Sequence, residues 1–381
     1  MSNRWNNTIT KIDAETNTLR NNVERAFFDE LNKSGYQRVT LPILDYADNY
    51  VINGGYHAIQ NHYKSISTNG EVYSLPNDLI IGLNSVASGF IEKKGRLCGA
   101  TEIFNFLPEN TEPSNDYQIG AIAYGMKGVE IEAEVIALAY DFAKFIGISN
   151  PRIYLSNTNI FQGVLNTNAG TNAQRSRLKN ILKGKIESDA DYSTYQVLNA
   201  LKNTEGSVTI IQEVAEKVNN KQSIDGLLNL FEISTVLEAY NINDSVVIKP
   251  SYYGNNEYDE GMVFFISDDK GRVAVVGGTC KYKKGKEQVD CVQMQLNVKD
   301  VIDIVKETKI FDTDSITVHV CIAASRQALL SAFAIKEELK KEGMITKFLY
   351  DVTEKDVMIM MQKNKEKVIM YVNEEGKIIH S

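Results

Sequence analysis

The sequence predicts an α+β protein: an antiparallel sheet flanked by helices, with a helical insertion and a small α/β domain after it. The first observation is the order of patterns along the 381 residues. A strand-rich stretch is followed by a helical stretch from Arg175 to about Tyr240, and then by a second strand-rich stretch. The second is a βαβαβ order near the C-terminus, which is typical of a mostly parallel sheet. We therefore expect a first domain over residues 1–312, with the insertion at about 170–242, and a second domain over residues 313–381.

The N-terminal third predicts one long helix followed by an interrupted strand. Apolar residues recur at helical spacing within residues 14–34, and Gly35 ends the run. The strand signal over residues 36–45 contains Pro42, which a strand tolerates only at an edge or a bulge. The pair Asn69-Gly70 then predicts a hairpin turn.

The remaining elements follow from the same patterns. In the first domain we predict strands at 97–106, 117–124, 245–248, 262–267 and 272–276, and a helix over 130–146 with an acidic first turn. In the second domain we predict strands at 316–323, 345–350 and 367–372, and helices at 326–342 and 354–365.

Composition limits the class of partner. Hydrophobic residues make up 43% and charged residues 24%, and the net charge is −8. The acidic balance disfavours a nucleic-acid partner, which usually requires a basic surface. No apolar run reaches the roughly 18 residues of a membrane span, and the N-terminus lacks the apolar stretch of a signal peptide. We expect a cytoplasmic protein with no membrane partner.

The histidines and cysteines do not predict a metal site. Cys98, Cys280, Cys291 and Cys321 are scattered without C-x-x-C spacing, and the four histidines are dispersed. The cysteines are expected to be small buried apolar residues. We predict neither a metal nor a cofactor.

Several segments together resemble the histidyl-tRNA synthetases and their non-synthetase paralogues, which are class II aminoacyl-tRNA synthetase-like proteins. Residues 35–44 look like motif 1, whose proline lies at the family's dimer interface; Pro42 is thus a dimer-interface candidate. Residues 96–105 and 116–125 look like the two strands of motif 2. Weaker matches occur at residues 130–138, 261–264 and 276–278. The resemblance implies a class II synthetase-like sheet, and the second domain resembles a reduced anticodon-binding domain.

The departures from the family concern the cations that adenylate formation needs around a phosphate. The motif 2 arginine would align with Asn105, and residues 291–302, where the motif 3 arginine is expected, contain none. Lys299 is the nearest cation there, but a lysine cannot reproduce a planar bidentate fork. Residues 252–258 and 75–78 also lack the arginines of the family pattern. The resemblance therefore favours a protein without synthetase activity.

The helical insertion is similar to that of the regulatory subunits of ATP phosphoribosyltransferase, on residues 198–201, 213–216 and 227–231. This resemblance implies a non-catalytic homodimer in the first step of histidine biosynthesis, bound to the short catalytic subunit, with histidine as a candidate ligand. A catalytically inactive paralogue that senses a ligand or only dimerises is one alternative. A divergent histidyl-tRNA synthetase is another, which the missing arginines disfavour.

Six residues are candidates for a ligand pocket, each with a plainer interpretation. Asn77 and Asp78 could bind an α-amino group or cap a helix that begins at Leu79. Gln118 could face the pocket or make a cross-strand hydrogen bond. The last three candidates are Asn105, Glu257 and Tyr258: Asn105 would fill the space left by an arginine, and the other two would contact an amino acid or lie in a solvated loop.

Overall fold

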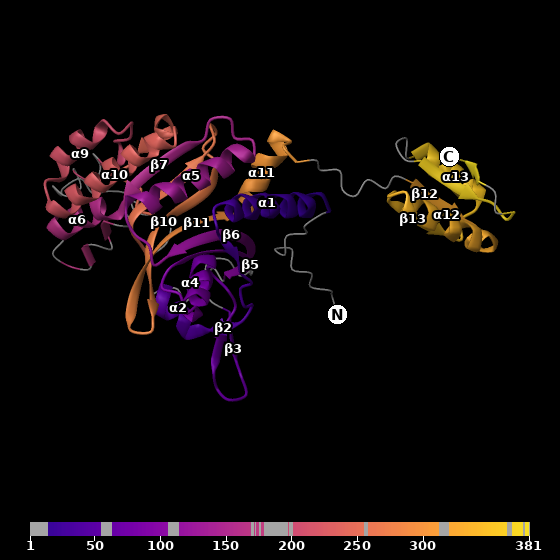
Figure 1. The fold of residues 1–381 in the computed structure, drawn as a ribbon, viewed down its shortest axis with the longest axis horizontal. Coiled ribbons are helices and arrows are strands. Elements are labelled where there is room, and N and C mark those ends of the chain that lie inside the picture. The colour runs from indigo at the N-terminus through magenta and orange to yellow at the C-terminus, as the bar shows by residue number, and fades with distance from the viewer. Residues whose placement is uncertain are drawn as a thin grey trace. The chain divides into compact units, whose positions relative to one another are not determined.

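The computed structural model describes residues 14–54, 63–105, 114–168, 171, 173–174, 177–178, 197, 201–254, 258–311, 320–363, 368–375 and 378–380. The chain forms two compact units, Met1–Phe311 and Asp312–Ser381. Their elements are labelled in Figure 1. Among the described residues, no helix combines the length and the apolar character needed to cross a bilayer.

An eight-stranded sheet is the centre of the first unit. Its spatial order is β1-β5-β6-β11-β10-β9-β7-β8, and every internal pair from β5 to β7 is antiparallel. Only the two edge pairs, β1 with β5 and β7 with β8, are parallel. The strands are β1 (Gln37–Arg38), β5 (Gly95–Asn105), β6 (Ser114–Tyr124), β7 (Arg152–Asn157), β8 (Val246–Ile248), β9 (Asp259–Ser267), β10 (Val273–Lys284) and β11 (Glu287–Asn297).

One face of this sheet, which we call the helix face, packs against a layer of helices (Figure 1). Alternate strand residues such as Ala121, Met294 and Phe264 are buried there against apolar residues of the helices. The helices are α1 (Ala14–Lys33), α5 (Val129–Phe145), α6 (Thr158–Asn168), α9 (Ile210–Val218), α10 (Lys221–Ala239) and α11 (Val298–Thr308). Helices α9 and α10 are the described part of the predicted insertion; residues 179–196 lie outside the described residues.

The opposite face, which we call the front face, is covered in part by α4 (Leu79–Gly89). Its buried residues Leu79, Ile80 and Leu83 pack against Ile122 and Tyr282 of the sheet. A small three-stranded sheet, of order β2-β4-β3, and helix α2 lie beside α4 (Figure 1). These elements are β2 (Asp45–Tyr46), β3 (Lys64–Ile66), β4 (Val72–Ser74) and α2 (Ala47–Gly54).

The second unit has a four-stranded sheet of order β13-β12-β14-β15. Strand β12 pairs in parallel with both β13 and β14, and β15 is antiparallel to β14. Apolar residues of β12 alternate between two clusters, so that Ile322 packs with α12 and Ala323 packs with α13. The elements are β12 (Val320–Ala324), α12 (Leu329–Lys341), β13 (Thr346–Tyr350), α13 (Glu354–Lys363), β14 (Val368–Val372) and β15 (Ile378–His380).

The predicted α+β class with a mainly antiparallel sheet is confirmed, and one predicted element is wrong. The strand expected over residues 36–45 is only two residues long, because β1 ends at Arg38. Pro42 follows in an irregular segment, whose Leu41 turns into the core against α4. A proline has no N–H for the ladder, so the chain leaves the sheet edge before it.

The turn after β6 generates the first testable prediction. Gly125 has a φ of +69°, and a Cβ there would lie 1.9 Å from the carbonyl oxygen of Lys93. Gly70 is also left-handed, with a φ of +86°, but a Cβ there would contact nothing. We expect Gly70→Ala to cost about 1 kcal/mol of unfolding free energy and Gly125→Ala at least about 2 kcal/mol more, because only the second adds a backbone clash.

Urea unfolding followed by circular dichroism measures both variants against the parent chain. Gly70→Ala is the matched control, since it isolates the cost of the left-handed backbone. Equal losses of stability in the two variants would contradict the expected clash at Lys93.

Candidate functional site on the front face

The start of α4 brings together three of the predicted pocket residues. Asp78 has an extended backbone and caps α4, accepting a 3.0 Å hydrogen bond from the Ile81 N–H. The Tyr258 hydroxyl donates to the two carboxylate oxygens of Asp78, at 3.0 and 2.9 Å. Gln118 of β6 accepts a weaker 3.4 Å bond from the Leu79 N–H. Asp78 and Tyr258 are 180 positions apart in the sequence, and they are in direct contact at the front face.

Asp78 is a half-buried acid whose side-chain partner, Tyr258, is an uncharged donor. Burial raises the pKa of Asp78, and the hydrogen bonds from Ile81 and Tyr258 oppose that rise. Burial, followed by the Asp78 charge, raises the pKa of Tyr258 well above its usual value, so its hydroxyl stays protonated and donates. Among the described residues, no lysine or arginine contributes to either shift.

Strand β11 adds two glutamines that the sequence analysis missed. Gln293 and Gln295 are buried, and their Oε1 atoms have no hydrogen-bond partner among the described residues. Gln293 donates from Nε2 to Asp259 at 3.4 Å. The signal was a pair of glutamines two positions apart within the otherwise apolar run Cys291–Leu296, which places both on one face of the sheet. Buried amides with an open acceptor make this face polar at its centre.

A cavity of about 280 Å³ lies at the end of the sheet where β11 runs into α11. Asp300, in the first turn of α11, reaches it from the segment where the family pattern has an arginine. Burial, followed by the charge of Asp116, raises the pKa of Asp300. The lining residues are Gln118, Val273, Ala274, Val276, Gln295, Leu296, Asn297 and Asp300. Among the described residues, the one charged residue of the lining is acidic, so this lining provides no cation that would stabilise a phosphate.

Two cysteines that are scattered in the sequence meet in this sheet. Cys280 and Cys291 lie directly opposite each other on β10 and β11, and both are free and buried. Hydrogen bonding to Cys291, followed by burial, raises the pKa of the Cys280 thiol well above its usual value. A thiol in this state is unreactive. Within the described ranges, no group of three or more His, Cys, Asp or Glu side chains is arranged to hold a metal ion.

The other candidates are less informative. Asn77 is half-buried beside Asp78. Glu257 lies outside the described residues, and so does the side chain of Asn105, which ends β5. Of the two interpretations of Asp78, the structure shows the helix cap directly. A role of these six residues in ligand binding stays a prediction.

The Asp78–Tyr258 contact generates a second prediction. Because the pKa of Asp78 is raised in the folded chain, its charge costs stability at neutral pH, and this cost falls as the pH drops toward the ordinary value of 3.8. We expect Asp78→Asn to keep the helix cap and to raise the melting temperature at pH 7, with the gain shrinking toward pH 4. Tyr258→Phe should lower the free energy of unfolding by about 1–3 kcal/mol at pH 7, since it removes a donor from a half-buried carboxylate.

Thermal unfolding between pH 4 and pH 7 tests both variants. The matched control is Asp269→Asn, which neutralises an exposed aspartate in a turn and should leave the melting temperature nearly unchanged. A lower melting temperature for Asp78→Asn at pH 7 would show that the carboxylate charge is needed here.

Comparison with known proteins identifies the family of this chain. The model of the histidyl-tRNA synthetase family matches residues 9–288. A protein of Clostridium novyi (strain NT) named ATP phosphoribosyltransferase regulatory subunit is 20% identical over 93% of this chain and 88% of its own length. One of the same name from Burkholderia cenocepacia (strain HI2424) is 24% identical, over 51% of this chain and 54% of its own length.

Solved structures show the same fold. An ATP phosphoribosyltransferase regulatory subunit/histidyl-tRNA synthetase from Bacillus halodurans C superposes with a TM-score of 0.78 and 18% identity, covering 94% of this chain and 95% of that one. Histidyl-tRNA synthetase from Nostoc sp. PCC 7120 gives a TM-score of 0.70 with 12% identity, covering 96% and 93%. The predicted class II synthetase-like fold is therefore confirmed. The chain belongs to the histidyl-tRNA synthetase family, and within it is similar to proteins named ATP phosphoribosyltransferase regulatory subunit.

Proposed function

We propose that this protein is a non-catalytic regulatory subunit that acts in the cytoplasm by binding a short-form ATP phosphoribosyltransferase catalytic subunit in the first step of histidine biosynthesis. The observation that carries the proposal is the similarity to regulatory subunits over nearly the whole chain, with 93% of it matched in the Clostridium novyi relative. The chemistry of the front face supports the same conclusion.

The front face is poorly suited to adenylate formation. That reaction needs cations placed around a phosphate, because negative charge develops there in the transition state. The cavity beside α11 presents Asp300 instead, and Asp116 adds a second negative charge nearby. The acid at the start of α4 is already bound by Ile81 and Tyr258. We therefore expect no ATP-dependent pyrophosphate exchange with histidine; measurable exchange would favour a divergent synthetase.

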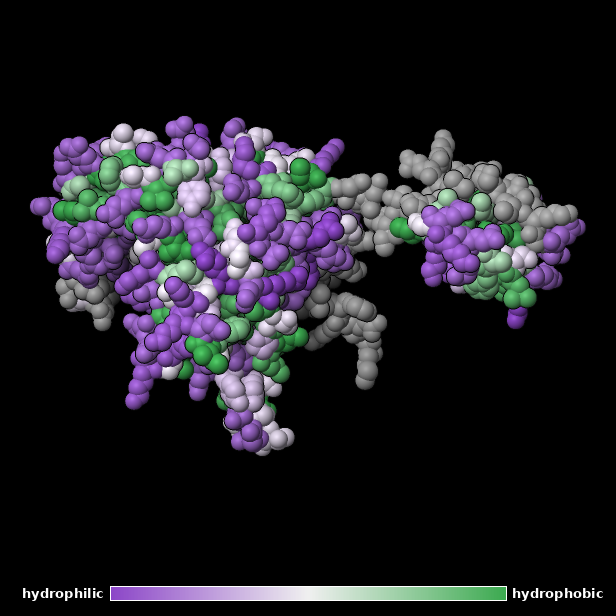
Figure 2. All heavy atoms as spheres, in the orientation of Figure 1, coloured by the Kyte–Doolittle hydropathy of each residue, from purple (hydrophilic) through white to green (hydrophobic). Residues whose placement is uncertain are grey.

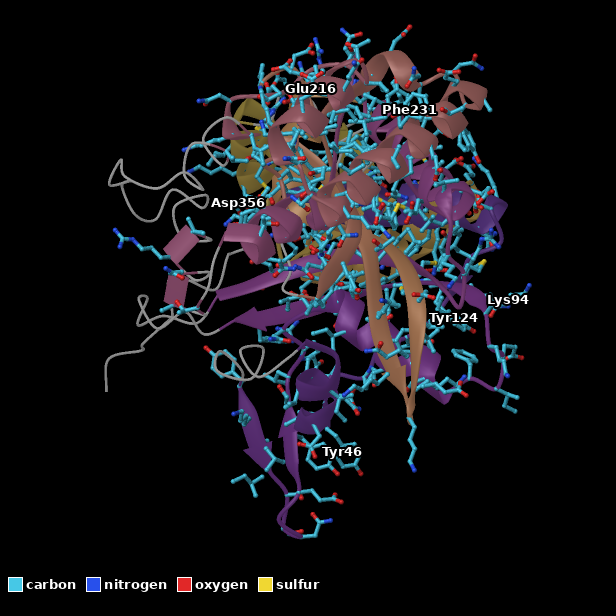
Figure 3. The ribbon with its side chains drawn as sticks, turned by 90° about the vertical axis from the view of Figure 1, so that its left-hand side faces the viewer. Tyr46, Lys94, Tyr124, Glu216, Phe231 and Asp356 are labelled. Carbon is cyan, nitrogen blue, oxygen red and sulfur yellow. The ribbon has the colours of Figure 1, made fainter. Side chains whose placement is uncertain are left out.

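An exposed apolar patch supports a homodimer. Ile43 and Leu44, next to Pro42, are 70% and 52% exposed. Tyr46, Ile52, Ile66 and Val72 are also exposed on the neighbouring small sheet and α2, and these six residues form what we call the β2 patch. In Figure 3, Tyr46 lies on the small sheet, well away from Tyr124 of the main sheet. Figure 2 shows apolar residues among the hydrophilic ones on this part of the unit. Patches of this kind mark interaction sites.

The dimer is tested by Leu44→Asp, which places a charge in the β2 patch and should halve the mass measured by light scattering after size exclusion. Ile91→Asp is the matched control, because Ile91 is 95% exposed and lies outside the patch. A dimer that survives Leu44→Asp, or that Ile91→Asp breaks as well, would contradict an interface at Pro42.

Partner binding is tested by co-purification with the short catalytic subunit from the same source, followed by an assay of its activity with and without histidine. We expect a stable complex whose activity differs from that of the catalytic subunit alone. Absence of both a complex and an effect would contradict the regulatory role and leave an inactive paralogue with another ligand. Repeating the assay with Tyr258→Phe shows whether the front face is involved in any histidine response.

A further inference from the structure

A second cavity, of about 210 Å³, lies on the helix face of the sheet, away from Asp78. It is bounded by the first turn of α5, the start of α6 and the strands β9, β10 and β11. Cys280 and Cys291 border it, but they pack with α4 on the front face. The cavity is lined by Met126, Lys127, Glu132, Asn159, Glu260, Gly261, Thr279, Cys280, Lys281, Asp290, Cys291 and Val292.

Glu132 is the central acid of this cavity. It is 8% exposed, and burial raises the pKa of its carboxyl. Asn229 donates to its Oε2 at 3.0 Å and is the one hydrogen-bond partner of the carboxylate within the described part of the chain. Asn157 in turn donates to the Asn229 carbonyl oxygen at 2.8 Å, which fixes the direction of that amide. A buried carboxylate held by a single neutral donor is stabilised by any cation that reaches it.

The two lysines of the lining do not neutralise the Glu132 carboxylate. Lys281 pairs with Glu260 at 2.8 Å, and Lys127 lies 4.0 Å from Asp290. The two charges of each pair cancel, so among the lining residues the charge of Glu132 is the one left uncompensated. The cavity therefore offers a position for one positive group beside Glu132 and the Asn159 side chain.

The rim of the same cavity suits an anion. Lys127 directly precedes the start of α5, and its side chain is 82% exposed, so it can turn toward an incoming group. Residues 128–131 at the start of α5 do not line the cavity, so the exposed Lys127 is the lining residue that would meet an anion at this rim. The volume is well above that of one water and below that of a drug-sized pocket.

We propose that this cavity binds a small zwitterion of the α-amino acid class, with its ammonium at Glu132 and Asn159 and its carboxylate at Lys127. The site lies on the other face of the sheet from the Asp78–Tyr258 pair. It goes beyond the proposed regulatory role, because binding here requires no catalytic subunit.

Calorimetric titration of the full chain with each of the twenty amino acids tests the proposal, with methylammonium and acetate as single-charge probes. We expect saturable binding of one or a few amino acids and much weaker binding of either probe. Glu132→Gln keeps an acceptor for Asn229 but removes the charge, and should weaken binding by about tenfold or more. Lys127→Glu, at an exposed position that leaves folding intact, should weaken it severalfold.

Glu238→Gln is the matched control, since it makes the same change at an exposed helical residue of the same unit, outside the lining. It should leave the affinity unchanged. The proposal is wrong if no amino acid binds at millimolar concentration, or if Glu132→Gln and Lys127→Glu both bind as the parent does. Binding that is lost in Tyr258→Phe but not in Glu132→Gln would place the ligand on the front face and overturn this site.

Discussion

The antiparallel strands β5, β6, β11 and β10 are covered by helices on the helix face and in part by α4 on the front face, and this constraint decides what each strand residue can do. Packing on the helix face is close at Gly277 of β10, where a Cβ would lie 2.4 Å from the ring of Phe264 on the paired strand β9. Successive residues of a strand point to opposite faces, so Met294 enters the helix-face core while its neighbours Gln293 and Gln295 enter the front face. A polar side chain on these strands must therefore find its partner within a covered layer.

The front face meets that requirement in part, since Asp78 is hydrogen-bonded whereas the Oε1 atoms of Gln293 and Gln295 have no partner among the described residues. Asp78 is held by the helix that it caps and by Tyr258, so the acid is already bound before any ligand arrives. At the other end of this face, Asp300 and Asp116 stand where a nucleotide-binding protein would place cations. A sheet of this kind can keep its fold when its polar positions change, because the fold depends on the apolar alternation and the chemistry depends on a few polar positions.

The buried polar groups of the helix face are arranged differently. Its core is mostly apolar, and near the starts of α5 and α6 Glu132, Asn229 and Asn157 form a short hydrogen-bonded chain. A buried carboxylate is costly in an apolar core, and this one is oriented by two amides. The two faces therefore carry two polar centres of different kinds: one is closed by its own tyrosine, and the other has a carboxylate with room beside it.

The sequence by itself determined most of the elements and their order, because apolar periodicity and turn residues are local properties, but β11 and α11 were not predicted. Helix α5, the strands of β5, β6, β9 and β10, and the βαβαβ order of the second unit were all predicted from local patterns. The departures from the synthetase pattern were equally visible, since they depend only on which residues are absent. The short β1 before Pro42 was predicted as a longer strand, because the point where the chain leaves a sheet edge depends on packing, here of Leu41 against α4.

Only the tertiary structure decided which polar residues meet. The bond from Tyr258 to Asp78, the opposition of Cys280 and Cys291, and the cavity at Glu132 each join segments far apart in sequence, and strand register and layer packing bring them together.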